Sequence, residues 1–508
     1  MTGAFTRLAT TLVSLISVAV LTTILRQLLH RNSHRPPVVW HWLPWLGSTI
    51  DYGKNPYGFF FKCREKYGDF FTFGLLGMKV TVFLGAKGNN FILNGKLKDL
   101  NAEEVYGPLT VPVFGRGVVY DVDNARFMDQ KRLLKEGFTS RNLRAYVPEF
   151  VKEVRHFVKT NAIFREKEGI CDISSVFSEI SLYTAAGSLQ GKEVRDSFDS
   201  QFATYYRHLD DGFAPINFMF PWLPIPINRR RDHAQKVMAG LYMDIIKKRR
   251  LEGNKTDSHD MLWALLGARY KDGTLISDEE MANLMIALLM GGQHNTAASG
   301  TWVMLHLAHR PHLIEELYQE QLNVMGEEEL TYEALQQLTL HNNVIKETLR
   351  LHSPIHSIMR KVKQPMQIPD TDVVVPAGHI LLAAPGVPSR CDEFFPNAMA
   401  WDPHRWDKSL EIDRQGDDQD GLNDTVDYGY GAVSSKAAHS PYLPFGAGRH
   451  RCVGETFAYA QLGAILVTLV QLLQWEQVDP KAPVPATDYS SMFSRPVHPA
   501  TIRWRHRQ

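Results

Sequence analysis

Runs of apolar residues with different spacings divide this chain into segments of different predicted structure. The first run holds 18 uncharged residues between Arg7 and Arg26. As a helix it would be about 27 Å long, close to the hydrocarbon thickness of a bilayer. We therefore predict an N-terminal transmembrane helix. A cleaved signal peptide is the alternative, but Arg26 follows the run and no small-x-small cleavage site does.

The residues around this run predict its orientation and its end. One arginine precedes the run, whereas Arg26, Arg31 and Arg35 follow it, so the positive-inside rule places the rest of the chain in the cytosol. The proline-rich stretch 35–48 cannot continue the helix. Its three tryptophans suit a membrane interface, and the same composition also suits a rigid spacer.

The remaining chain alternates between short strand-like pieces and long helical stretches. Residues 57–67 have helical spacing and precede two strand-like runs, FFTFGLL and KVTVFLG. Residues 120–350 are mainly helical in pattern, and short β-rich pieces with prolines return at 365–385. A last apolar helix is predicted for 455–473. The expected fold class is therefore mainly α with a smaller β portion (α+β).

The chain is expected to have three parts, because no flexible linker interrupts its body. Residues 1–34 form a membrane anchor, 35–48 a proline-rich linker and 49–508 one large domain. Within that domain, residues 408–440 are acidic, rich in glycine and serine and without apolar periodicity. Such a stretch predicts an exposed insertion.

Composition narrows the classes of function. Hydrophobic residues make up 44% of the chain and aromatic residues 11%, enough for a large core and for a pocket that holds an apolar ligand. A formal net charge of +1 gives no indication of a nucleic-acid partner. The four cysteines contain no CxxC pair, which argues against a disulfide scaffold or a structural zinc site.

One of these cysteines, Cys452, lies in a glycine-rich segment that carries candidate chemistry. The segment has the form F-G-x-G-x-x-x-C-x-G and leads directly into the apolar stretch 455–473. Glycines allow tight turns and close backbone approach, and amide groups at a helix start can lower the pKa of a thiol. Such a thiolate can be the axial ligand of a haem iron. A buried structural cysteine is the alternative, which five fixed positions and the attached helix disfavour.

This segment resembles the haem-binding signature of the cytochromes P-450, and two further segments agree. Glu347 and Arg350 give E-x-x-R at the end of a helical run, and WDPHRW supplies Arg405. In that family a Glu–Arg–Arg set forms a charged network that supports the haem-binding core. The resemblance implies the cytochrome P-450 fold and haem b with Cys452 as the axial thiolate.

A long buried helix is predicted between Ser277 and Pro311. Ser277 and Glu280 form a capping box, and the apolar character is nearly all round. Gly291 and Gly292 each cost about 1 kcal/mol relative to alanine, which indicates a kink or the close approach of a flat cofactor. In cytochromes P-450 this helix crosses the haem and carries an acid–alcohol pair that delivers protons. The resemblance places His294 at the acid position, Asn295 at the alcohol position and Thr296 beside it.

The Gly-Gly-Gln-His sequence in this helix resembles the sterol 14α-demethylases in particular. Segments 102–122, 209–224 and 351–362 look like their distal pocket, their substrate-access region and the strand that borders their haem. The resemblance extends over essentially the whole body. The insertion at 408–440 and the proline-rich start look more like fungal members than like animal or plant ones.

This resemblance assigns roles to individual residues. Haem propionates are anions that need cationic or hydroxyl donors, and a sterol needs a long apolar cavity with few polar anchors. The residues implied to bind haem are Tyr106, Tyr120, Lys131, Arg360, His450 and Cys452. Those implied to line the sterol pocket are Phe114, Phe213, Phe218, His356, Ser357 and Ile358. Taken singly, the two tyrosines suit a core position and Lys131 a solvated helix face.

The implied activity is the removal of the 14α-methyl group of a sterol precursor, lanosterol or eburicol, in ergosterol biosynthesis. Three successive oxygenations each consume O2 and two electrons from NADPH, and the carbon leaves as formate. The resemblance implies that the electrons come from an NADPH–cytochrome P-450 reductase. Since no Rossmann fingerprint opens a βαβ unit, the chain itself is not expected to bind NADPH. The protein is expected in the endoplasmic reticulum membrane, with a single span and a cytosolic catalytic domain.

Asn295 departs from that family, which has threonine or serine at this position. An amide is not a comparable proton-relay group, and Thr296 projects about 100° further around the helix. Two alternatives therefore stay open. The chain could be a diverged paralogue that oxidises another sterol or a terpenoid, or a haem protein that binds sterols or azole inhibitors with little turnover.

Overall fold

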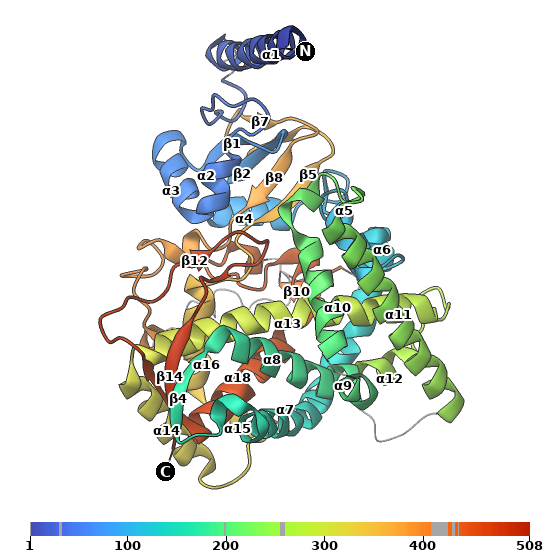
Figure 1. Ribbon diagram of the computed structural model, residues 1–508, viewed down its shortest axis with the longest axis vertical. Helices are drawn as coiled ribbons and strands as arrows, with labels where there is room; N and C mark the ends of the chain where they lie inside the picture. Colours follow the sequence, from blue (N-terminus) through green and yellow to red (C-terminus); the bar gives the residue numbers. More distant parts are fainter. Residues whose placement is uncertain are drawn as a thin grey trace.

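The computed structural model describes residues 2–29, 33–197, 200–253, 260–407, 425–428, 432–434 and 436–507. Most of the expected insertion at 408–440 therefore lies outside the described residues. The described part confirms the expected class, because helices form most of the body and strands a smaller portion that gathers mainly at one end (Figure 1).

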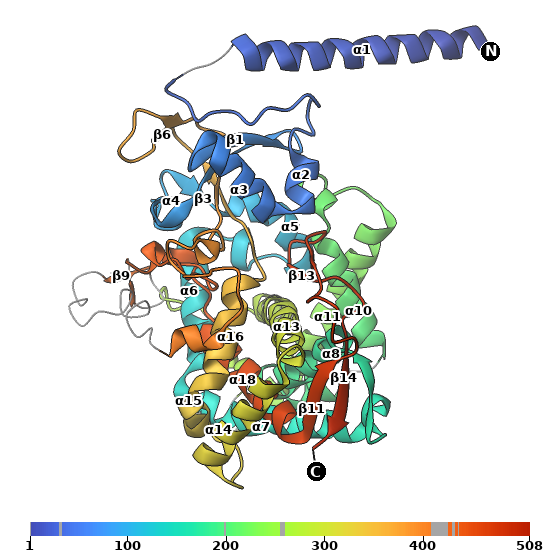
Figure 2. The same ribbon diagram turned by 90° about the vertical axis from the view of Figure 1, so that its left-hand side faces the viewer.

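The N-terminal helix α1 (Thr2–Leu29) stands apart from the body and lies across that end (Figure 2). Its 28 residues give a length of about 42 Å. The linker that follows is not a free spacer, because Val38 and Gly47 form isolated bridges with Thr72 and Leu75. The linker thus lies along the outer edge of the larger sheet.

The larger sheet has five strands in the order β1-β2-β8-β5-β3. Only β2 and β8 are parallel, and the other neighbours are antiparallel. Its aromatic and β-branched residues pack on α3 and form a separate hydrophobic core. The burial of these residues explains why this part of the sequence has a strand-like pattern. The strands are β1 (Phe70–Leu75), β2 (Met78–Phe83), β3 (Leu100–Asn101), β5 (Ile358–Val362) and β8 (Ile380–Ala383).

The helical part is arranged around α13 (Asp278–Ala308), which runs through the middle of the body (Figures 1 and 2). The capping box of Ser277 and Glu280 starts this helix as predicted. The other helices are α2 (Thr49–Lys54), α3 (Pro56–Tyr67), α4 (Gly85–Leu93), α5 (Glu103–Phe114), α6 (Asn124–Lys135), α7 (Ser140–Thr160), α8 (Ile173–Ala185), α9 (Lys192–Asp196), α10 (Ser200–Asp210), α11 (Pro226–Glu252), α12 (Met261–Leu266), α14 (Pro311–Met325), α15 (Tyr332–Gln337), α16 (Thr339–Leu351) and α18 (Glu455–Leu472).

Helix α18 is long and apolar enough to span a membrane, but most of it is buried inside the body, so it is a core helix. The chain leaves it into β11 (Leu473–Gln477), which pairs with β14 (Thr501–His506) and then β4 (Glu168–Asp172). Short pairs complete the structure: β6 (Met366–Gln367) with β7 (Val374–Val375), β9 (Thr425–Asp427) with β10 (Ala432–Ser434), and β12 (Thr487–Asp488) with β13 (Arg495–Pro496).

Candidate active site

Cys452 lies in a tight loop that ends at the start of α18. The Cys452 amide donates to Phe445 O at 3.0 Å and closes the loop. Gly448 has φ of 65°, and a Cβ at this position would lie 2.4 Å from Leu93 O. Only glycine satisfies both conditions, so this part of the predicted motif has a steric cause.

The Cys452 side chain is accessible to solvent although protein atoms surround it. It is exposed, whereas Cys63, Cys171 and Cys391 are buried. Yet burial raises the pKa of the Cys452 thiol, and a hydrogen bond from the Gly454 amide opposes this shift. A side chain that water can reach but that protein surrounds lies in an internal space rather than on the outer surface. An amide donor to the sulfur favours the thiolate.

The middle of α13 presents a matching interruption in an otherwise buried helix. Gly291 is exposed and Gly292 partly exposed, whereas all residues from 296 to 308 are buried. A Cβ added at either glycine would meet no atom within 4 Å. The glycine pair therefore leaves room for a flat group to approach the helix backbone closely.

A group of basic and phenolic side chains lies beside the Cys452 loop. Arg360 of β5 is 4% exposed, and in the described part of the chain its guanidinium makes one hydrogen bond, to Met359 O, and no ion pair. Its charge acts on Tyr106, Tyr120 and His450, so these four groups lie close together. A buried cation without a counter-ion is costly, which indicates a binding site for an anion.

Tyr106, Tyr120 and His450 form one ring cluster. The two tyrosines are stacked with centroids 5.3 Å apart, and His450 lies 6.0 Å from Tyr120. His450 Nδ1 is buried and has no hydrogen-bond partner among the described residues. Burial raises the pKa of both tyrosines and lowers that of His450 far below its usual value. These groups are therefore neutral and able to donate hydrogen bonds.

Lys131 of α6 connects this cluster to the thiol loop. Its Nζ donates to Arg449 O and Arg451 O, each at 2.8 Å, so it holds the backbone directly before Cys452. Burial lowers the pKa of Lys131 to about 7. The solvated-charge alternative does not describe this lysine, which is 4% exposed.

These residues fit a haem. Its iron needs one soft ligand, which Cys452 would supply, and its propionates need buried donors, which Arg360, His450, Tyr106 and Tyr120 would supply. The orphaned Nδ1 of His450 and the unpaired charge of Arg360 are observations that an anionic group would explain. The predicted haem-binding roles remain predictions that this arrangement supports.

Replacing Arg360 by methionine is expected to lower haem retention strongly while the protein still folds, because a buried cation is removed together with its need for an anion. The measurement is the ratio of haem to protein after purification. Lys363→Met, at an exposed position that follows β5, is the matched control and should bind haem normally. Equal haem content in both variants would contradict the assignment.

His294 is held in a polar network that the sequence did not reveal. Its Nε2 lies 3.0 Å from Asp210 Oδ1 and 2.8 Å from Tyr206 OH, both on α10. The Tyr206 hydroxyl also donates to Gln293 Oε1. An ionised carboxylate only accepts hydrogen bonds, so His294 Nε2 carries the proton. Tyr206 and Asp210 share one face of α10 at the spacing i, i+4, a weak signal in the sequence.

The two residues after His294 point to different surroundings. Asn295 Nδ2 donates to Gly291 O at 2.7 Å, one turn earlier in the helix. The buried Thr296 hydroxyl donates to Gln461 Oε1 of α18 at 3.1 Å. Thr296 is thus committed to the helix core, and its catalytic role stays a prediction that no contact supports.

Aromatic rings connect the predicted pocket walls with His294. Phe114 packs edge-on against Phe213 with centroids 5.9 Å apart, Phe213 against Phe493 at 5.7 Å, and Phe493 stacks on His294 at 5.4 Å. Phe493 was missed because its surrounding sequence has no motif. Phe218 is partly buried against the same core, and Ile358 approaches the thiol loop, since its Cδ1 would lie 3.7 Å from a Cβ at Gly446.

His356 and Ser357 lie in a second polar group, together with Tyr52 of α2. The Tyr52 hydroxyl donates to Ser357 Oγ at 3.0 Å, and Ser357 Oγ lies 2.8 Å from His356 Nδ1. Burial lowers the pKa of His356 to about 4, so its ring is neutral. The predicted contact of both residues with substrate is compatible with this arrangement and stays a prediction.

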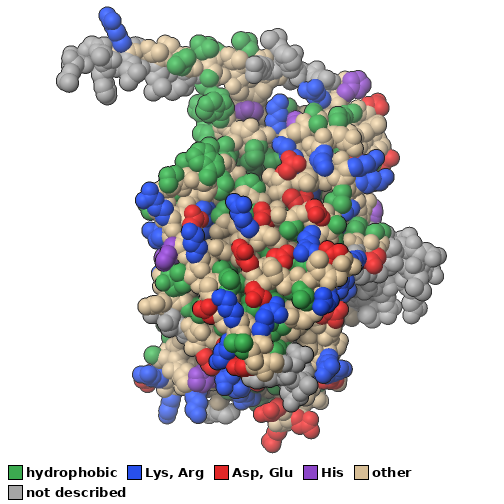
Figure 3. Space-filling view, turned by 90° about the vertical axis from the view of Figure 1, so that its right-hand side faces the viewer, with side chains coloured by type: hydrophobic (Ala, Val, Ile, Leu, Met, Phe, Trp, Pro, Cys, Tyr) green, Lys and Arg blue, Asp and Glu red, His purple; other side chains and the backbone are tan. Residues whose placement is uncertain are grey.

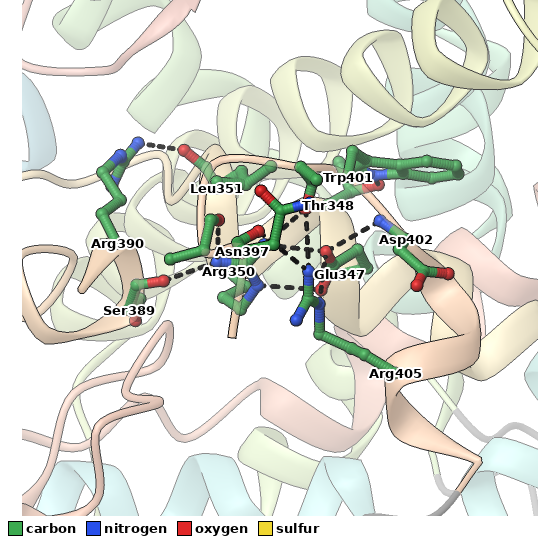
Figure 4. A network of polar contacts seen from close by, with 12 residues as sticks. Glu347, Thr348, Arg350, Leu351, Ser389, Arg390, Asn397, Trp401, Asp402 and Arg405 are labelled. Atoms are coloured by element: carbon green, nitrogen blue, oxygen red, sulfur yellow. Dashed lines mark hydrogen bonds and ion pairs between the residues drawn. The ribbon is translucent and has the colours of Figure 1, made fainter. Parts of the chain in front are cut away.

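The predicted Glu–Arg–Arg network is present and largely buried (Figure 4). Glu347 accepts from Arg350 Nε and Nη2, each at 2.8 Å, and from Arg405 Nε at 2.9 Å. It also accepts from the Asp402 amide and from the Trp406 indole. The two arginines donate in addition to five backbone carbonyls, of Ser389, Pro396, Asn397, Ala398 and Ala400.

Comparison with known proteins gives concordant results. The model of the family described as Cytochrome P450 matches residues 36–504. Sterol 14-alpha demethylase CYP51C of Gibberella zeae is 61% identical over 496 residues, covering 97% of this chain and 95% of that protein. Eburicol 14-alpha-demethylase of Uncinula necator is 52% identical over 503 residues, covering 97% and 94%.

The chain is also similar to proteins of known structure. The retinoic acid bound cyanobacterial CYP120A1 superposes with a TM-score of 0.76 over 94% of this chain and 100% of that chain. At 20% sequence identity, this likeness concerns the fold alone.

Proposed function

Because the chain belongs to the sterol 14α-demethylases of the cytochrome P450 family, we propose that it removes the 14α-methyl group of a sterol such as lanosterol or eburicol. The observation that carries this proposal is the internal space that Cys452 faces, together with the exposed glycine pair of α13. The aromatic walls beside His294 suit an apolar substrate. The relatives at 52 and 61% identity support the reaction.

Haem and protein would make different contributions to the reaction. Bound haem would supply oxygen activation, which thiolate ligation by Cys452 would favour. Arg360, His450 and the two tyrosines would hold its propionates. The rings of Phe114, Phe213 and Phe493 exclude water and orient the sterol skeleton. His294 holds a proton at Nε2 between Tyr206 and Asp210, and can exchange it during each oxygenation.

The direct test is turnover of lanosterol and of eburicol by the purified protein with a reductase and NADPH. The expected result is 14-demethylated sterol, followed by mass spectrometry, with an equal amount of formate. Tight sterol binding without product would favour the alternative of a sterol-binding haem protein, for which Asn295 is the specific observation. Product from another sterol only would favour a diverged paralogue.

Asn295→Thr is expected to preserve or raise the coupling of NADPH use to product, because a hydroxyl can pass on a proton and an amide cannot. Coupling is the ratio of demethylated sterol to NADPH consumed, measured with peroxide release as the complement. Thr296→Val removes the hydroxyl that bonds Gln461 and serves as the comparison. Lower coupling in Asn295→Thr would show that the amide is better adapted to this site.

The membrane location is part of the same proposal. Helix α1 is long enough to span a bilayer, and Leu15, Val18, Leu21 and Leu25 are all more than half exposed on it. Hydrophobic side chains gather on the body directly below α1 (Figure 3). Exposed aromatic residues come from two segments, Trp40, Trp42 and Trp45 in the linker and Phe220 and Trp222 before α11. Both segments suit a membrane interface. We place the protein in the endoplasmic reticulum membrane with its body in the cytosol.

Leu15→Arg is expected to weaken membrane insertion, since an arginine at a helix centre costs about 2.5–3.5 kcal/mol on insertion scales. The measurement is the fraction of full-length protein that resists alkaline extraction from membranes, with Leu15→Met as the matched control. An unchanged fraction in Leu15→Arg would mean that α1 does not span the bilayer.

We propose that electrons enter on the side of the thiol loop that borders a surface groove. A groove of about 500 Å³ lies there, lined by residues of α15, α16 and α18 and by Phe445, Gly446 and Arg451 of the loop itself. A NADPH–cytochrome P450 reductase docked on this face would lie directly behind Cys452. The shortest route from the partner to the cofactor then passes the loop that holds the thiolate.

A further inference from the structure

The Asn295 side chain has one defined orientation. Its terminal atom lies 2.7 Å from Gly291 O. Two oxygens at this distance would repel, so the contacting atom is the amide nitrogen and the hydrogen-bond pattern assigns the amide. Asn295 Oδ1 is buried and accepts no hydrogen bond from the described residues. A buried acceptor without a hydrogen bond, here Asn295 Oδ1, lowers the stability of the protein. We infer that the amide nitrogen has a function that offsets this cost.

The amide nitrogen is the accessible polar end of the Asn295 side chain. The hydrogen bond between Asn295 Nδ2 and Gly291 O is exposed, whereas Asn295 Oδ1 is covered. The neighbouring Gly291 is exposed and carries no side chain that would cover it. An amide nitrogen has two hydrogens, of which Gly291 O takes one. The second is available to a ligand.

A threonine at this position would offer a different group. Threonine in a helix commonly bonds back to the carbonyl four residues earlier, as Thr301 does with Ala297 O at 2.7 Å in this helix. Its single hydrogen is then used, and what remains is an acceptor. Asparagine satisfies the same carbonyl and keeps a donor. The substitution therefore exchanges a group that can relay a proton for a fixed N–H donor.

We propose that Asn295 is a substrate-binding residue that donates a hydrogen bond to a carbonyl oxygen and so favours sterols that carry a 14α-aldehyde. This inference rests on the proposed function, in which the 14α-carbon leaves as formate after three oxygenations and the aldehyde is therefore the substrate of the last one. The aldehyde oxygen only accepts hydrogen bonds, which matches an N–H donor. The parent 14α-methyl group makes no hydrogen bond at all.

The test is spectral titration of the full-length, haem-loaded protein with the 14α-aldehyde sterol and with its 14α-methyl parent. The measured quantity is the ratio of the two Kd values. Asn295→Leu, of similar size and without polar atoms, is expected to reduce the preference for the aldehyde about fivefold, which corresponds to about 1 kcal/mol. Asn295→Thr should lose a similar part of the preference, because its hydrogen is committed to Gly291 O.

The matched control is Ile358→Val, which trims the pocket wall without changing a polar group and should alter both Kd values by the same factor. A second readout without sterol is the C–O stretching frequency of the ferrous carbon monoxide complex. Loss of a nearby donor should raise this frequency in Asn295→Leu. The proposal is overturned if neither variant changes the Kd ratio, or if the 14α-methyl parent rather than the aldehyde loses affinity. Absent turnover by the wild type with an intact Kd ratio would overturn the demethylase function and leave this inference standing.

Discussion

Cys452→Ser is expected to abolish the carbon monoxide band that characterises haem-thiolate proteins and to lower turnover by at least about a thousandfold. A serine hydroxyl stays protonated near neutral pH and cannot replace a thiolate as an electron-donating ligand. Removing one group that stabilises a transition state commonly lowers the rate by a factor of this order. The measurements are the difference spectrum of the reduced protein with carbon monoxide and the rate of sterol turnover.

Cys63→Ala is the matched control for this variant. Cys63 is buried in the core between α3 and the larger sheet and is not part of the thiol loop. Its substitution should cost some stability but leave the carbon monoxide band in place. A haem-thiolate band that persists in Cys452→Ser would assign the ligand to another residue and remove the basis of the active site.

Glu347→Ala is expected to destabilise the protein by about 3–5 kcal/mol and to yield little haem-loaded material. The Glu347 carboxylate is fully buried and accepts five hydrogen bonds, from two arginines, one indole and one backbone amide. Its removal leaves the buried guanidinium of Arg350 without a counter-ion, which is the costly way to break a buried pair. The measurements are the free energy of unfolding in denaturant and the haem content.

Two companion variants make this result specific. Glu347→Gln keeps the shape but removes the charge, and should be intermediate between the wild type and Glu347→Ala. Asn342→Ala, at an exposed position of the same helix, should change the unfolding free energy by less than about 0.5 kcal/mol. A small effect of Glu347→Ala would mean that the network is not needed to support the core.

The local pattern of the chain determined most of its secondary structure and the core of the site. The predicted helix at 57–67 is observed as α3 (Pro56–Tyr67), and that at 455–473 as α18, one residue shorter at its end. The capping box of Ser277 and the glycines around Cys452 act through bonds and contacts within a few residues. Their physical requirements are therefore visible in a short stretch of sequence.

The tertiary structure decided which side chains meet. Tyr206 and Asp210 contact His294 across 88 and 84 positions of the chain, and no periodicity in either segment points to the other. The same holds for Phe493 and for Tyr52, which comes from a short helix without a motif. The packing of α10 against the helices around it brings Tyr206 and Asp210 to His294, and that packing depends on the whole core.

Thr296 shows the difference most clearly. Its place beside Asn295 made it a candidate for proton delivery, but its hydroxyl meets Gln461, 165 positions away, inside the helix core. The sequence by itself determined the thiol loop, the buried central helix and the acidic residue of the charged network, because each follows from local geometry or from a motif. Only the folded chain decided which polar group on α13 faces the internal space, because that depends on how one face of a helix is rotated against all of its neighbours.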